Sequence, residues 1–147
     1  MNVEISPMDD NRGTLRRTVE ATFAGDFDTA IEAMAEDAVV EWPQSGERIV
    51  GRQACLTVYR NYPGGSPAYD LTRITGGPDV FTVEARGDYS GETVYLTSIV
   101  EFRNGKIAKQ TDYFASAFEA PAWRSGMVER MARRGKSGGD DRIRTGE

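Results

Sequence analysis

The chain has 147 residues and a formal net charge of −5, from 18 Lys and Arg against 23 Asp and Glu. This length suits one domain with a substantial core, and an acidic chain without a basic stripe is not expected to bind nucleic acid. Cys55 is the single cysteine and there is no histidine, which excludes an internal disulfide, Ser-His or Cys-His chemistry and imidazole metal sites. We therefore expect no metal and no cofactor, and acid–base chemistry from carboxylates, Tyr, Lys or Arg.

Residues 1–10 are polar and are interpreted as a loose N-terminal arm. The first twenty residues hold no apolar targeting segment, and nowhere do eighteen apolar residues run together. A secretory signal and a membrane span both need such a segment. The sequence therefore predicts a cytoplasmic protein with no membrane contact.

Apolar residues at helical spacing predict three helices in the first half of the chain. Leu15, Val19 and Phe23 form one stripe on a helix over Asn11–Ala24 that ends at Gly25. Asp26 is a predicted N-cap for a second helix, whose apolar positions are Phe27, Ala30, Ile31 and Met34. A short strand, Ala38–Trp42, ends at Pro43, and Gly51 opens a third helix with Cys55, Val58, Tyr59 and Tyr62 on one stripe.

The second half of the chain is predicted to form antiparallel strands. Two are expected over Tyr69–Thr75 and Val80–Asp88, and two more flank the pair Asn104-Gly105 within Thr93–Phe114. Asn-Gly favours a two-residue type I′ turn, because that turn needs positive φ at both central residues. The order of elements predicts an α+β fold.

The C-terminal part is predicted to contain one more helix and a tail. Trp123, Met127 and Met131 recur every four residues and predict a short closing helix over Ala120–Ala132. Residues 133–147 are rich in Gly and charge, and we expect them to be disordered because they hold too little apolar surface to bury. Residues 11–132 then make up the domain.

Asp112 is the main candidate for chemistry. Strand alternation places it on one face with Gln110 and Phe114, and Lys109, Thr111 and Tyr113 on the other. Asp is depleted in strands, so this carboxylate is expected either on a solvated face or in a pocket. Burial among Trp42 and Phe114 would raise its pKa toward the range that acid–base catalysis needs. The alternative is a structural hydrogen bond to an Arg or Tyr.

Three stretches, FAGDFDTAIEAMAEDAVVEWP, IVGRQA and IVEFRNGKIAKQTDYF, resemble the SnoaL-like branch of the nuclear transport factor 2-like superfamily, which includes polyketide cyclases. The likeness covers about Thr14–Trp123. It implies a cone-shaped α+β barrel, in which a curved antiparallel sheet wraps the N-terminal helices around a largely apolar pocket. It also implies homodimers through the outer face of the sheet. The same fold hosts proteins without catalysis.

Three catalytic arrangements of that superfamily can be compared by position. The acid–base residues of ketosteroid isomerases correspond here to Trp42, Thr18 and Val100, which cannot do that work. Epoxide hydrolases of the limonene type use two Asp and an Arg, for which Asp112, Arg86 and Asp88 are candidates, although Val39 and Glu41 replace the expected Tyr and Asn. In the cyclases an acidic residue on the last strand abstracts a proton, and Gln110 stands nearest to the usual His. Asp112 is common to these possibilities.

The other candidates have two interpretations each. Glu84, Arg86 and Asp88 share a strand face that is either solvated or holds an Arg86–Asp88 ion pair in the pocket. One of Glu41 and Trp42 is expected to face the pocket, Trp42 as a wall. Candidates for ligand contact are thus Glu41, Trp42, Tyr59, Tyr62, Gln110 and Phe114, although the two tyrosines are more simply core residues.

The leading hypothesis is a cofactor-independent cyclase, isomerase or epoxide-hydrolase-like enzyme that acts on an apolar, oxygenated small molecule. Catalysis is assigned to Asp112, Arg86 and Asp88. The missing histidine and the incomplete catalytic sets keep open a non-catalytic ligand-binding protein or a dimeric scaffold of the same fold. We expect a homodimer that buries part of the strand face with Tyr95, Thr97, Ile99 and Glu101.

Overall fold

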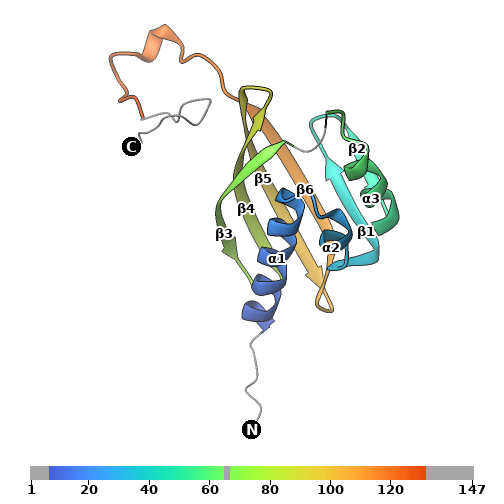
Figure 1. Cartoon of the computed structure of the whole chain (residues 1–147). Helices are drawn as coiled ribbons and strands as arrows, with labels where there is room; N and C mark the ends of the chain where they lie inside the picture. Colours follow the sequence, from blue (N-terminus) through green and yellow to red (C-terminus); the bar gives the residue numbers. More distant parts are fainter. Residues whose placement is uncertain (1–6, 65–66, 132–147) are drawn as a thin grey trace.

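The computed structural model describes residues 7–64 and 67–131. Three helices, α1 (Pro7–Phe23), α2 (Phe27–Ile31) and α3 (Arg52–Arg60), lie on one side of a six-stranded sheet (Figure 1). The strands are β1 (Met34–Trp42), β2 (Glu47–Val50), β3 (Ala68–Gly76), β4 (Val80–Tyr89), β5 (Glu92–Arg103) and β6 (Lys106–Ser116). The predicted α+β architecture is confirmed.

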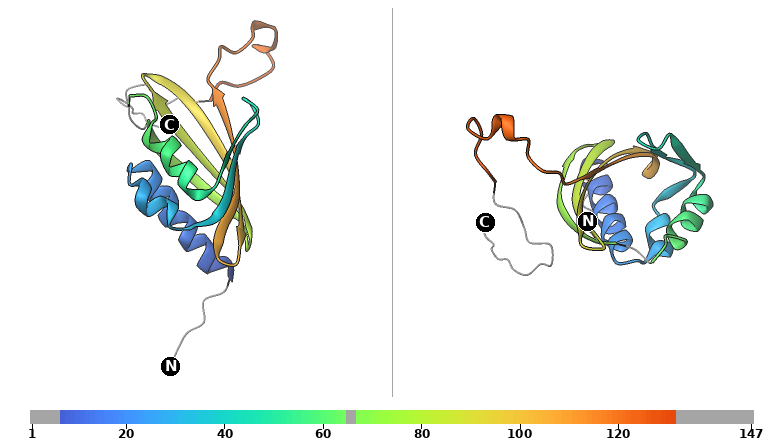
Figure 2. Two further views of the ribbon diagram at one scale, coloured as in Figure 1. Left: turned by 90° about the vertical axis from the view of Figure 1, so that its right-hand side faces the viewer. Right: turned by 90° about the horizontal axis from the view of Figure 1, so that it is seen from above.

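The sheet has the order β2-β1-β6-β5-β4-β3, so β2 and β3 are its edges. All neighbouring strands are antiparallel except β1 and β6, which are parallel. The sheet is curved but not closed, and its concave face wraps around the helices (Figure 2). Strand twist makes such curvature the normal shape of a sheet with long strands. The result is a cone with a helical lining.

The β5–β6 hairpin forms at the predicted turn. Asn104 and Gly105 have φ of 53° and 77°, and Arg103 pairs with Lys106 across them. The predicted type I′ geometry is confirmed by these two positive angles. A bulge between Glu101 and Phe102 then shifts the pairing by one residue. Ser98 is therefore the cross-strand neighbour of Asp112.

Helix α1 packs against the sheet through its predicted stripe, in which Leu15 and Val19 are buried. The helix begins at Pro7 and not at Asn11, so residues 7–10 are helical and are not a loose arm. Pro suits a first helical turn because the N–H that it lacks has no partner there. Arg12 donates to the carbonyl of Ile74 at 2.5 Å, which ties the helix to β3.

The second helix is shorter than predicted. Asp26 caps it, since its side chain accepts from the backbone N–H of Thr29 at 3.3 Å. The helix ends at Ile31, and Met34, predicted as its last apolar residue, begins β1 instead. Met34 is still buried, so the apolar position was identified correctly but the element was not.

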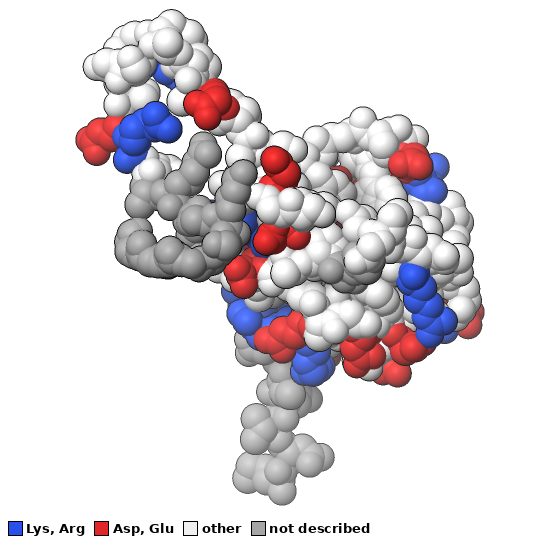
Figure 3. Space-filling view, turned by 45° about the horizontal axis from the view of Figure 1, so that its top comes forward, with Lys and Arg blue, Asp and Glu red and all other residues white. Residues whose placement is uncertain are grey.

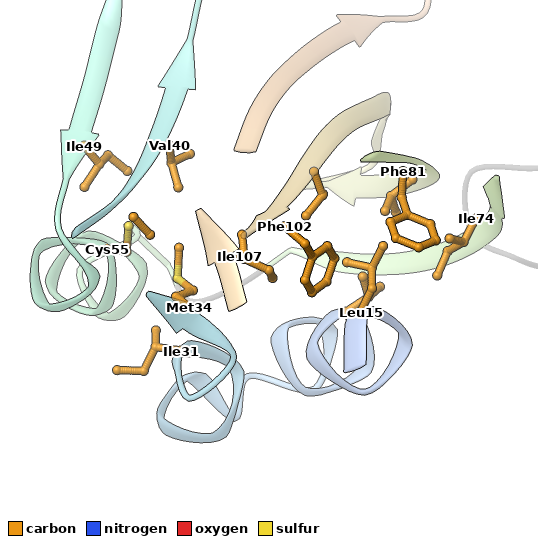
Figure 4. Close-up of a cluster of buried hydrophobic side chains, with 14 of the residues drawn as sticks. Leu15, Ile31, Met34, Val40, Ile49, Cys55, Ile74, Phe81, Phe102 and Ile107 are labelled. Carbon is orange, nitrogen blue, oxygen red and sulfur yellow. The ribbon is translucent and has the colours of Figure 1, made fainter. Parts of the chain in front are cut away.

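The hydrophobic core has two adjoining parts (Figure 4). In one, Leu15 of α1 meets Ile74, Phe81 and Phe102 of the sheet, and the rings of Phe81 and Phe102 make an edge contact at 5.7 Å. In the other, Cys55 of α3 lies beside β1 and β2, whose core residues are Met34, Val40 and Ile49. The core occupies the closed end of the cone and leaves its other end to the cavity described below.

The predicted closing helix over 120–132 is wrong for the residues that the structure describes. That segment holds only a short 3-10 turn, Ala122–Arg124, and it projects away from the domain (Figure 1). Trp123 and Met127 are each 72% exposed, so the apolar stripe is not buried against the part of the domain that the structure describes. A short isolated helix is marginal without such packing, and Gly126 weakens it further. The predicted disordered tail, residues 133–147, lies outside the described residues.

Within the described ranges, no helix is long and apolar enough to cross a membrane. On the face shown in Figure 3, acidic and basic side chains occur in small mixed groups that are separated by uncharged surface.

Candidate functional site

A cavity of about 390 Å³ lies between the helices and the concave face of the sheet. Its walls come from α1, α2, α3, the segment after α3, and the strands β1 and β3–β6. Apolar and aromatic side chains make up most of the lining, among them Leu15, Val19, Phe23, Phe27, Val58, Val83, Leu96 and Val100. The cavity has the size and composition of a site for a small organic molecule.

Asp112 is the buried carboxylate of this cavity, with only 6% of its surface exposed. Its Oδ1 accepts hydrogen bonds from Ser98 Oγ at 2.6 Å and from Gln110 Nε2 at 2.9 Å. Its Oδ2 accepts one from Trp42 Nε1 at 2.9 Å. All of these donors are neutral, and within residues 7–64 and 67–131 no Lys or Arg forms an ion pair with Asp112.

Burial raises the pKa of Asp112 above its ordinary value of 3.8, because removal from water penalises the charged form. The hydrogen bonds from Ser98, Trp42 and Gln110 oppose that change and lower the pKa, but burial has the larger effect. The carboxylate is thus held in place by hydrogen bonds without a cation to stabilise its charge. A carboxylate whose pKa is raised by burial in a cavity is a candidate for proton exchange with a ligand.

The two oxygens of Asp112 differ in the number of lone pairs that are not used by hydrogen bonds. A carboxylate oxygen has two lone pairs. Oδ1 uses both, for Ser98 and Gln110, whereas Oδ2 receives only Trp42 among the described donors. Oδ2 is therefore the oxygen with an open position toward a ligand.

Trp42 is held by the turn that follows β1. The side-chain amide of Gln44 both donates to and accepts from the backbone of Phe114, each at 2.5 Å, which joins this turn to β6. The rings of Trp42 and Phe114 meet edge to face at 6.3 Å. This arrangement fixes the indole N–H on Asp112 and builds one aromatic wall of the cavity.

Six of the residues predicted for the site line the cavity: Trp42, Tyr59, Tyr62, Gln110, Asp112 and Phe114. They come from β1, α3, the segment that follows α3, and β6. Burial raises the pKa of Tyr59, and the charge of Asp112 acts in the same direction, so its hydroxyl stays protonated.

Glu41 is not in the cavity. It faces the outer side of the sheet, where it accepts from Arg48 Nε at 3.0 Å and lies 3.4 Å from Lys109 Nζ. The hydrogen bond from Arg48 is the main cause that lowers its pKa. The prediction that Glu41 contacts a ligand in the pocket is corrected, because alternation along β1 turns Trp42 inward and Glu41 outward.

Arg86 and Asp88 are also outside the cavity, which corrects their assignment as catalytic residues. Arg86 lies on the outer face, where Asp70 is its ion-pair partner at 4.0 Å. Asp88 is exposed and accepts from the backbone N–H of Gly91 in the turn after β4. Of the two interpretations given above, the solvated face is right, because Phe81, Val83 and Ala85 take the buried face of β4.

The sequence reasoning missed Ser98, Tyr69 and Tyr89, which all line the cavity. Ser98 could not be located because the β5 bulge decides which residue faces Asp112. Tyr69 was recognised only as a strand residue, and Tyr89 fell one residue beyond the predicted strand. The inward alternation of Phe81, Val83 and Ala85, continued along β4, is the signal that would have found Tyr89.

Metal and thiol chemistry have little support in the part of the chain that the structure describes. No three Asp, Glu or Cys side chains gather there in a way that could hold a metal ion. Cys55 is fully buried in the core, and burial raises the pKa of its thiol to about 11. It therefore behaves as a small apolar residue.

A curved sheet that wraps helices around an apolar pocket is the fold of nuclear transport factor 2-like proteins. The family model of the SnoaL-like domain matches residues 15–110, and the chain belongs to that family. No curated protein has a sequence that matches this chain.

Known structures agree with this assignment. An NTF-2 like protein of unknown function from Burkholderia xenovorans LB400 is 40% identical, with a TM-score of 0.75 over 84% of this chain and 96% of that one. A putative ketosteroid isomerase from Kribbella flavida is 25% identical, with a TM-score of 0.80 over 88% and 96%. An LEH-like epoxide hydrolase of M. tuberculosis, 22% identical with a TM-score of 0.61 over 74% and 85%, shares the fold.

Proposed function

We propose that the protein is a cofactor-independent acid–base enzyme of the cyclase, isomerase or epoxide-hydrolase kind, with Asp112 as its proton-transferring group and an apolar, oxygenated small molecule as its substrate. One observation carries the proposal: a carboxylate that is 6% exposed sits in an apolar cavity on neutral donors only. Structural relatives described as a putative ketosteroid isomerase and an epoxide hydrolase support the same general class.

In this proposal Oδ2 of ionised Asp112 removes a proton from a ligand carbon next to a carbonyl. The electron pair of the broken C–H bond moves into the new C–C double bond, and the carbonyl oxygen gains the negative charge. Protonated Asp112 then returns the proton to another carbon, or to an oxygen, of the same ligand. For an epoxide, Oδ2 would instead take a proton from water as the water oxygen attacks a ring carbon. The C–O bond to that carbon breaks, its electron pair moves to the ring oxygen, and protonated Asp112 then gives the proton to that oxygen. Trp42, Ser98 and Gln110 keep the carboxylate oriented through either sequence.

Two probes that need no knowledge of the natural substrate test this function. The first is deuterium exchange into the α-carbons of 2-tetralone, followed by NMR, and the second is hydrolysis of styrene oxide. We expect wild type to accelerate at least one reaction, and Asp112→Asn to reduce the rate about 10²–10⁴-fold. The matched control is Asp88→Asn, which removes an exposed carboxylate outside the cavity and should leave the rate unchanged. Equal rates for wild type and Asp112→Asn would contradict the proposal.

A non-catalytic ligand-binding protein is the second candidate, and one observation favours it. Besides Asp112, no residue described in the cavity lining supplies a further carboxylate or a cation. By the resemblance given above, the lining residues Trp42, Thr18 and Val100 correspond to the acid–base positions of ketosteroid isomerases. Melting of Asp112→Asn at neutral pH tests whether Asp112 has a structural role instead of a catalytic one. The enzyme proposal predicts an unchanged or higher melting temperature, because a desolvated charge has been removed. A marked fall would indicate that Asp112 is structural.

We also propose a homodimer that uses the outer face of the sheet. Tyr95 and Tyr113 are 43% and 42% exposed on adjacent strands of this face. Partly apolar sheet faces of this kind are often covered by a second copy. Sedimentation at micromolar concentration should show a species of twice 16.2 kDa, and a species of 16.2 kDa alone would contradict this proposal.

A further inference from the structure

The cavity holds a second polar feature in addition to Asp112. The hydroxyl groups of Tyr69 on β3 and Tyr89 on β4 are hydrogen-bonded to one another, and both rings line the cavity. Tyr69 stacks on Phe23 with ring centroids 4.8 Å apart, and Tyr89 meets Tyr62 edge to face at 6.2 Å. The two hydroxyls are therefore held together by rings that are themselves packed on other aromatic side chains.

The backbone of β4 makes room for this pair. Gly87 lies directly under the two rings, and a Cβ added there would come within 2.7 Å of the Tyr69 ring and 3.0 Å of the Tyr89 ring. Any other residue at this position would push the tyrosines apart. Because the φ of Gly87 is not positive, the space that the residue leaves explains the glycine here better than its backbone angles do.

Strand register places the backbone of the tyrosine pair and that of Asp112 in different rows of the sheet. Asp112 shares a row of the sheet with Ser98 and Val83, whereas Tyr69 shares a row with Gly87 and Val94. From Ser98 to Val94 is four residues along β5, or about 13 Å at the usual rise of a strand. The row of Asp112 is buried and that of Tyr69 is partly exposed, so the pair lies nearer the mouth. Leu96 lines the cavity between the two rows.

The chemistry of two joined phenols determines what they can recognise. One hydroxyl donates to the other, which leaves a single O–H proton whichever of the two is the donor. A hydroxyl that takes part in such a chain becomes a better donor, because hydrogen bonds polarise one another. Burial raises the pKa of both tyrosines, so this proton is present at neutral pH.

The geometry points to Tyr69 and Tyr89 as a second binding site within the cavity. This tyrosine pair donates one hydrogen bond to an acceptor oxygen at the end of the ligand opposite the group that reacts at Asp112. This inference rests on the proposed function for the end of the ligand that reacts at Asp112. It specifies the substrate class further: an elongated, mainly apolar molecule with one oxygen function at the deep end of the cavity and a carbonyl-type oxygen near the mouth. The pair determines specificity and takes no part in proton transfer.

The test compares two probes of the same shape, 2-acetylnaphthalene and 2-isopropenylnaphthalene, which differ only in C=O against C=CH₂. Wild type should prefer the ketone, and the double variant Tyr69→Phe/Tyr89→Phe should reduce that preference about five- to tenfold, the usual effect of one lost hydrogen bond. Both hydroxyls must be removed, because either one alone can still donate. The control Tyr95→Phe/Tyr113→Phe removes two hydroxyls that lie outside the cavity, on the outer face of the sheet, and should not change the preference.

A wild type without preference for the ketone, or a preference that survives loss of both cavity hydroxyls, would overturn the inference. The infrared C=O stretch of the bound ketone gives a readout that does not depend on a folded variant. It should lie below the value in cyclohexane, and a cyclohexane-like frequency would also overturn the inference. Asp112→Asn should keep the ketone preference. A failure of the proposed catalysis at Asp112 can therefore be distinguished from a failure of the proposed hydrogen bond from the tyrosine pair.

Discussion

Asp112 and Glu41 lie on neighbouring strands, β6 and β1, but on opposite faces of the sheet. Glu41 pairs with Thr111 in the register, one residue from Asp112. On the outer face Glu41 has Arg48 and Lys109 beside it, and its pKa is lowered. On the inner face Asp112 has only neutral donors, and burial raises its pKa. One position in the register of β1 and β6 thus separates a carboxylate stabilised as a charge from one that is suited to exchange a proton.

The largest difference expected between the two faces is in stability. Phe81→Ala on the inner face should cost about 3–5 kcal/mol of unfolding free energy, because Phe81 is 1% exposed and its loss leaves a cavity in the core. Thr82→Ala, the next residue and on the outer face, should stay within about 0.5 kcal/mol of wild type. Urea unfolding of both variants measures the difference. Similar losses for the two would contradict the assignment of the faces.

A smaller effect, opposite in sign for the two carboxylates, is expected in the pH dependence of stability. The pKa of Asp112 is raised by folding. Its contribution to the stability of the folded state is therefore fully present below pH 3.8 and is lost as the pH rises through the folded pKa. The pKa of Glu41 is lowered, so its contribution is present above 4.5 and is lost as the pH falls through the folded pKa.

The free energy of unfolding of wild type should therefore fall relative to that of Asp112→Asn as the pH rises from 3.8. Relative to Glu41→Gln, it should fall as the pH decreases below 4.5. Denaturant unfolding of the three proteins across this range provides the measurement. For each variant, the difference in unfolding free energy from wild type is followed against pH. Slopes of the same sign for the two variants would contradict the described difference between the two faces.

Local signals explain what could be predicted from the sequence. Asn104-Gly105 fixes its own turn through positive φ, and the four-residue spacing of Leu15, Val19 and Phe23 follows the helix that buries them. Asp112 was identified as the central residue because an Asp between aromatic residues conflicts with ordinary strand composition. These features depend on a few neighbouring residues, and the structure agrees with them.

Features that depend on distant parts of the chain could not be predicted in the same way. Alternation put Arg86 and Asp88 on a common face, but only the packing of Phe81 and Val83 against the helices shows that this face is the outer one. A hairpin counted outward from the turn without a bulge would have placed Thr97 beside Asp112, whereas the bulge brings Ser98 there. The tyrosine pair joins β3 and β4 near the mouth, which no local pattern indicates.

Site-resolved titration of the carboxyl ¹³C signals of Asp112 and Glu41 tests the central claim most directly, because it requires neither substrate nor turnover. In ordinary peptides Asp titrates below Glu. Here that difference should become smaller or change sign, because the pKa of Asp112 lies above 3.8 and that of Glu41 lies below 4.5. A pKa of Asp112 at or below 3.8 would mean that its hydrogen bonds outweigh its burial, and would contradict its assignment as the proton-transferring group.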